Sequence, residues 1–156
     1  MLEDMLEPRD KQAQLLYQCE FMTPYQRQSP RFRTMEDARN RLYDIQSSRV
    51  WAEKIRIAGY VHLSFDLSDT LAGLFTWLPS RHPEITLYQH GMTDSTLLHE
   101  LAHYIHSWRH GYKYPHHGWR YARIYLGLLH NFVNEQAARD LMGWFDHAGV
   151  KYGKAR

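Results

Sequence analysis

Five consecutive residues, His99-Glu100-Leu101-Ala102-His103, combine the side chains that metal-dependent hydrolysis requires. On a helix, residues four apart lie about 6 Å apart along the axis and about 40° apart around it, so both imidazoles can reach one metal ion. Glu100 then lies beside that ion, where a carboxylate can take a proton from metal-bound water. The spacing predicts that His99 and His103 bind Zn2+ and that Glu100 is a general base.

The residues around this motif predict a helix with two different faces. Thr93 or Asp94 can cap its start and Gly111 can stop it, so we expect a helix over about residues 93–110. At 100° per residue, histidines share one side and apolar residues the other. The histidines are His99, His103, His106 and His110, and the apolar residues are Leu97, Leu101, Ile105 and Trp108, with Leu98 beside them. We expect the apolar side to pack on a sheet.

A catalytic zinc usually has three protein ligands and one water, so a third ligand must come from elsewhere. His106 and His110 continue the same row along the helix, and a straight row cannot wrap a tetrahedral ion well. We expect them at the rim of a cleft, in contacts behind the ligands, or in solvent. A zincin subclass with a third histidine six residues after the second is disfavoured, because position 109 is arginine.

Two later segments contain the remaining candidates for the third ligand. His117 would open the next helix and could lean back across the metal, and we favour it over its neighbour His116. Glu135 is the alternative from a later helix, although it could instead form an ion pair with Arg139 four residues on.

The elements around the motif predict an α+β domain with a small, mostly antiparallel sheet. We expect N-terminal helices over about residues 8–48, with Pro8 opening the first and Thr34 the second. Three strands are expected over about residues 57–90, at 57–67, 71–78 and 84–90. Further helices are expected over about residues 117–148, with a break near 131–134. The 156 residues suggest a single domain.

Composition restricts the other classes of function. The formal charge of +2 does not indicate nucleic-acid binding by itself, and a cluster of arginines near aromatic residues supports it only weakly. One cysteine excludes an internal disulfide and a thiolate zinc cluster. The polar, acidic N-terminus is unlike a secretory signal, and no apolar run is long enough to span a bilayer. We therefore expect a cytoplasmic protein without a membrane partner. The arginines in the cluster that weakly supports nucleic-acid binding are Arg31, Arg33, Arg39, Arg41 and Arg49.

The order of a strand, a helix with HELAH, a loop and then HHGWRYARIYLGLL resembles the SprT-like (Spartan-type) zinc metalloproteases. It is also similar to small actinobacterial and actinophage metallohydrolases of the same plan. The resemblance implies a minimal zincin-like fold, with His99, His103 and His117 as zinc ligands and Glu100 as the base. Tyr121 occupies the aromatic position of the third-ligand segment. The chain departs from the family at Trp119 and Arg120, where the family has proline and glutamate.

Together these patterns predict a zinc metallopeptidase acting on a protein or peptide substrate. Tyr121, one helical turn past His117, is the first candidate to stabilise the oxyanion, and His116 is the second. We expect the substrate to lie along the edge of the strand at residues 84–90. The alternatives are a gluzincin-like enzyme that uses Glu135 and a non-catalytic zinc-binding protein on the same fold. No pattern in the sequence indicates an oligomeric state.

Overall fold

Helices precede and follow three short strands in the computed structural model, which describes residues 10–78 and 80–153. This order confirms the predicted α+β class. The chain divides into two compact units: a sheet unit, residues 28–105, and a terminal unit, residues 1–27 with 106–156. Helix α4 (Asp94–His110) begins in the sheet unit and ends in the terminal unit. The single domain over residues 1–156 stays a prediction.

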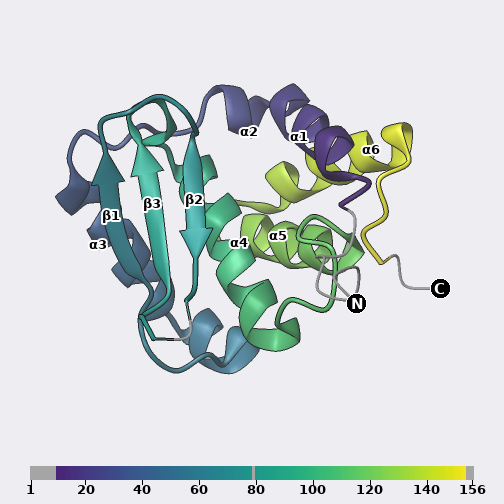
Figure 1. Ribbon diagram of the computed structural model, residues 1–156. Helices are drawn as coiled ribbons and strands as arrows, with labels where there is room; N and C mark the ends of the chain where they lie inside the picture. The colour runs from purple at the N-terminus through teal and green to yellow at the C-terminus, as the bar shows by residue number, and fades with distance from the viewer. Residues whose placement is uncertain (1–9, 79, 154–156) are drawn as a thin grey trace. The chain divides into compact units, whose positions relative to one another are not determined.

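The sheet unit contains strands β1 (His62–Asp66), β2 (Gly73–Thr76) and β3 (Glu84–Tyr88), each within its predicted range. Their order is β1-β3-β2 (Figure 1), and β3 runs parallel to β1 and antiparallel to β2. The sheet is therefore mixed, and the expectation of a mostly antiparallel sheet is wrong. The parallel pair forms because the connection from β1 to β3, which includes β2, is long enough to cross over.

The central position of β3 also contradicts the expectation that a substrate lies along its edge. Both sides of β3 are already hydrogen bonded, to β1 and to β2. Ile85 and Leu87 of β3 are fully buried. Of the three strands in the described sheet, β1 and β2 are the ones at its edges.

Helix α3 (Met35–Gln46) begins where the sequence predicts, because Thr34 closes a capping box. The Thr34 hydroxyl accepts from the Asp37 amide, and the Thr34 amide donates to the Asp37 carboxylate. A π-helix, η2 (Trp51–Ile55), follows it, and Arg56 ends this turn in the left-handed conformation with φ 59°. The sequence analysis did not predict this turn.

The start of α4 is held by Thr93 directly before it, by Ser29 and by Arg41 of α3. A short 3-10 turn, η3 (Gln89–Gly91), leads from β3 to the helix. The Thr96 amide donates to the hydroxyl of Thr93, the predicted cap, and the Ser95 amide donates to the Ser29 hydroxyl. Arg41 forms an ion pair with Asp94, at 2.7 Å, in the first turn. The two amide hydrogen bonds satisfy N–H groups that have no partner within the helix at its N-terminus.

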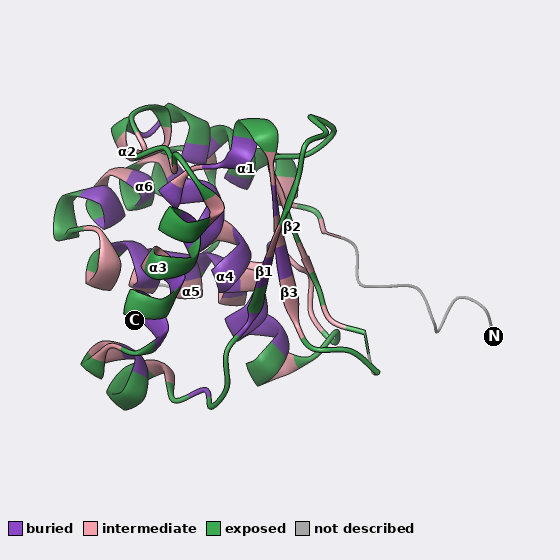
Figure 2. Cartoon of the chain, turned by 90° about the vertical axis from the view of Figure 1, so that its left-hand side faces the viewer, coloured by how far each residue is buried: buried purple, intermediate pink, exposed green. Residues whose placement is uncertain are grey.

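The apolar side of α4 is buried along most of the helix, and buried residues are purple in Figure 2. The buried residues include Leu97, Leu98, Leu101 and Ile105, as predicted. Trp108 differs, because 47% of it is exposed near the end of the helix. Gly111 follows with φ +59°, which confirms the predicted stop.

The terminal unit packs helix α1 (Ala13–Met22) and α5 (Trp119–Phe132) against α6 (Glu135–Ala148), with the short α2 (Pro24–Arg27) beside them. The predicted break between the last two helices is confirmed, since Asn134 caps α6 through the Ala137 amide. The expected start of the first helix at Pro8 lies outside the described residues. Within residues 10–78 and 80–153, none of the helices is both long enough and apolar enough to cross a bilayer.

Candidate metal centre

Helix α4 places the two histidines of the HELAH motif side by side. The ring centroids of His99 and His103 are 5.1 Å apart, with an angle of 70° between the rings. Both side chains are half-buried, and Glu100 is buried between them in sequence. The helical spacing predicted from the sequence therefore gives two adjacent imidazoles and a carboxylate that is largely shielded from water.

His117 is held by Asp10 from the other end of the sequence. The Nδ1 atom of His117 lies 2.5 Å from Oδ2 of Asp10, and the His117 amide donates to Oδ1 of the same carboxylate at 3.2 Å. The Gln12 side chain also donates to the His117 carbonyl at 2.9 Å. A carboxylate on Nδ1 favours the tautomer in which Nε2 carries the lone pair, the usual arrangement behind a metal-binding histidine.

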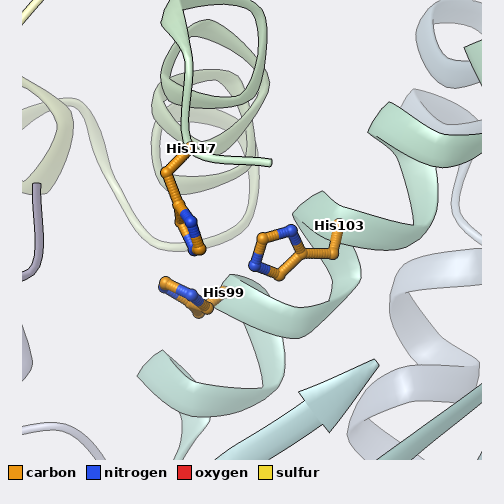
Figure 3. Close-up of side chains that lie close together, drawn as sticks. All are labelled: His99, His103 and His117. Atoms are coloured by element: carbon orange, nitrogen blue, oxygen red, sulfur yellow. The ribbon is translucent and has the colours of Figure 1, made fainter. Parts of the chain in front are cut away.

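One ring nitrogen from each of His99, His103 and His117 lies within 4.8 Å of the others, a group that could hold a metal ion. Figure 3 shows two of the imidazoles on α4 and the third on the segment that leads into α5. Three neutral imidazoles are a donor set that zinc accepts, with a fourth position left for water. The residues present therefore fit the expected metal, and the structure brings the three predicted ligands together.

The other candidate ligands are not part of this group in the described chain. His116 lies beside Tyr112, with 6.2 Å between the ring centroids. Glu135 is exposed and forms an ion pair with Arg139 at 2.6 Å, as its non-ligand interpretation predicted.

Glu100 is in close contact with strand β2. A Cβ atom added at Gly73 would lie 2.8 Å from Cγ of Glu100 and 2.8 Å from Cγ2 of Thr96. Because real side chains do not approach so closely, only glycine fits this position without a shift of its neighbours. Gly73 thus lets the strand lie directly against the expected base.

Of the three positions expected for His106, burial excludes the rim of a cleft and solvent, because only 1% of the residue is exposed. A contact behind the predicted ligands stays a prediction. Its buried Nε2 atom has no hydrogen-bond partner among the described residues. Burial, with smaller contributions from the nearby charges of His110, His116, Arg120 and His117, lowers the pKa of His106 from 6.5 to about 4. His106 is therefore a neutral imidazole near neutral pH.

Tyr121 lies with its ring edge toward His117, at 5.0 Å between centroids. It is fully buried and stacks on Tyr125. The structure thus places Tyr121 beside His117, the predicted third ligand, while the expected role of Tyr121 at the oxyanion stays a prediction.

Three residues near the expected metal were missed by the sequence analysis: Asp10, Tyr17 and Gly73. The Tyr17 hydroxyl lies 2.9 Å from Nε2 of His117. No local pattern indicates that Asp10 or Tyr17 meets a residue about a hundred positions later. Gly73 had a usable signal, since an isolated glycine in a strand often marks the close approach of another group.

Some of the arginines that suggested nucleic-acid binding form hydrogen bonds or ion pairs within the sheet unit. Arg31 donates to the Gln89 carbonyl at 2.6 Å, and Arg49 forms an ion pair with Glu53 at 2.6 Å. With Arg41 bound to Asp94, three of the five have partners that belong to the fold. A nucleic-acid partner stays a weakly supported prediction.

Comparisons of the chain with family models, with curated proteins and with solved structures found no match.

Proposed function

We propose that the chain is a zinc-dependent metallohydrolase, and specifically a metallopeptidase. The observation that carries this proposal is the group of three imidazoles within 4.8 Å, together with Glu100 on the same helix as two of them. A structural zinc site usually has four protein ligands, whereas three ligands leave a position for a reacting water. The resemblance to the SprT-like metalloproteases supports the same set of roles.

Zinc at this site would lower the pKa of a water and polarise the substrate carbonyl. Glu100 accepts a proton from that water as its oxygen adds to the carbonyl carbon. Glu100 then gives the proton to the leaving nitrogen as the C–N bond breaks. One water is consumed, and the products are a carboxylic acid and an amine. Asp10 keeps His117 oriented throughout, because it binds Nδ1.

An extended peptide can add to the edge of β2, whereas β3 is central in the described sheet and offers no free edge. Strand β2 pairs with β3 on one side, and Gly73 of β2 lies against Glu100. A peptide that adds to a sheet edge is held by main-chain hydrogen bonds along its length. Binding at β2 would therefore bring a peptide carbonyl next to the expected base.

Glu100→Gln tests the assignment of the base. The variant keeps the volume of the side chain but cannot accept the proton, so peptide hydrolysis should fall by about 10²–10⁴-fold. Zinc content, measured by elemental analysis of the purified chain, should stay at one ion per chain. Glu53→Gln, at an exposed site, is the matched control and should change neither property.

A mixed library of fluorogenic peptides supplies the substrate for this test. Hydrolysis by Glu100→Gln at the rate of the unmodified chain would refute the role of Glu100. A chain that binds zinc but cleaves no member of the library would instead favour the non-catalytic zinc-binding alternative.

The third ligand is tested separately by comparing His117→Ala with His116→Ala. Removal of His117 should lower zinc affinity by orders of magnitude, because two imidazoles remain, whereas removal of His116 should leave it nearly unchanged. Equal losses in the two variants, or loss in Glu135→Ala alone, would overturn the assignment.

A further inference from the structure

The Tyr17 hydroxyl occupies the one nitrogen of His117 that a metal can use. Asp10 already binds Nδ1, and the Tyr17 oxygen lies 2.9 Å from Nε2. The two rings meet edge-on, with 4.8 Å between their centroids. A zinc ion would bind Nε2 at about 2.0–2.1 Å through the same lone pair. The hydroxyl and the metal therefore compete for one atom.

The structure allows Tyr17 to move away while its helix stays in place. Its side chain is 47% exposed, so a rotation does not disturb the core. Its neighbours on α1, Leu16 and Cys19, are buried and fix the helix. Tyr121 has no such freedom, because it is fully buried. Of these two tyrosines, Tyr17 is the one that can change position when a metal arrives.

We propose that Tyr17 has two successive roles at this centre. In the metal-free chain its hydroxyl holds Nε2 of His117 and so keeps the third ligand in place. Once a metal displaces it, the hydroxyl remains close to the metal and donates a hydrogen bond to the substrate carbonyl oxygen as negative charge develops there. The second role rests on the proposed hydrolase function, and the first does not.

The expected size of each effect follows from the type of interaction. Loss of a competing neutral hydrogen bond should tighten metal binding by about 5-fold. Loss of a donor to the developing oxyanion should lower kcat by about 10²–10³-fold. Because the oxyanion forms only during the reaction, KM should change little.

Tyr17→Phe tests both roles, because it removes the hydroxyl and keeps the ring. Metal affinity is measured on the full chain by competition for Zn2+ with a chromophoric chelator. Tighter zinc binding together with a lower kcat is the expected result. Tyr43→Phe removes a hydroxyl from an exposed tyrosine that stacks on Tyr60 in the sheet unit, and it should change neither quantity.

Unchanged or weaker zinc binding in Tyr17→Phe overturns the competition between Tyr17 and the metal. A kcat equal to that of the unmodified chain overturns the role at the oxyanion while leaving the hydrolase function intact. If the unmodified chain cleaves no peptide, the proposed function fails and the zinc measurement still decides the first role. Tyr17→Leu repeats the zinc measurement without the aromatic ring, and thermal unfolding of each variant shows whether it is folded.

Discussion

Asp10 and His117 show how a single carboxylate can orient a predicted metal ligand. The two residues are 107 positions apart, and the carboxylate contacts both the ring and the main chain of the histidine. By contrast, His99, Glu100 and His103 lie within one helical turn, so their spacing alone predicts that they meet. The sequence could therefore predict the helical half of the site. It could only suggest His117, and it contained no local pattern that pointed to Asp10.

Replacement of Asp10 should weaken metal binding without removing a ligand. The amide oxygen of Asn can still accept a hydrogen bond from Nδ1 of His117, but it carries no charge. We therefore expect Asp10→Asn to lower zinc affinity by about 10-fold and Asp10→Ala by about 100-fold. Chelator competition measures both, and Asp44→Asn on the exposed side of α3 is the control. Equal affinity in all three variants would contradict the orienting role of Asp10.

At the scale of elements, α4 and β2 act as one support for the expected base. Tyr104 of α4 contacts Phe75 of β2 and Trp77 directly after that strand, and Gly73 of β2 lies against Glu100. The strands and the capped helices were predictable, because their signals are local hydrogen bonds and alternating burial. The parallel pairing of β1 with β3 was not, because it depends on the path of the connection between them.

Gly73→Ala should reduce catalysis while keeping the metal. The new methyl group would lie 2.8 Å from the Glu100 side chain, so Glu100 must shift. Because small displacements of a catalytic group are costly, kcat should fall by at least about 10-fold, with zinc content unchanged. Gly127→Ala, where an added Cβ meets nothing within 4 Å, is the control and should leave kcat unchanged. A Gly73→Ala variant with the kcat of the unmodified chain would show that β2 does not constrain the base.

At the scale of the whole molecule, His106 couples the stability of the fold to pH. The folded chain holds this imidazole neutral with a pKa of about 4, while the unfolded chain has the ordinary value of 6.5. The unfolded state therefore binds more protons between these values, and stability is lost as the pH falls. The shift corresponds to about 3 kcal/mol over that range.

The measurement is denaturant unfolding of the metal-free chain, kept in chelator, at pH 7 and at pH 4.5. We expect a lower free energy of unfolding at pH 4.5, and a smaller difference between the two pH values in His106→Leu. His110 contributes in the same direction, since burial and the charges of Arg120 and Arg109 also lower its pKa. The same pH dependence in His106→Leu as in the unmodified chain would contradict the assignment to His106.

The pairing of Asp10 and Tyr17 with His117 also sets an order of events during synthesis. Ribosomes make the chain from its amino end, so Asp10 and Tyr17 emerge long before the histidine that they contact. Until the chain has been extended past His117, only two of the three predicted ligands, His99 and His103, have been made. A nascent chain would therefore offer an incomplete set of the predicted ligands, and tight binding of a metal at this site would have to wait until the two distant segments have met.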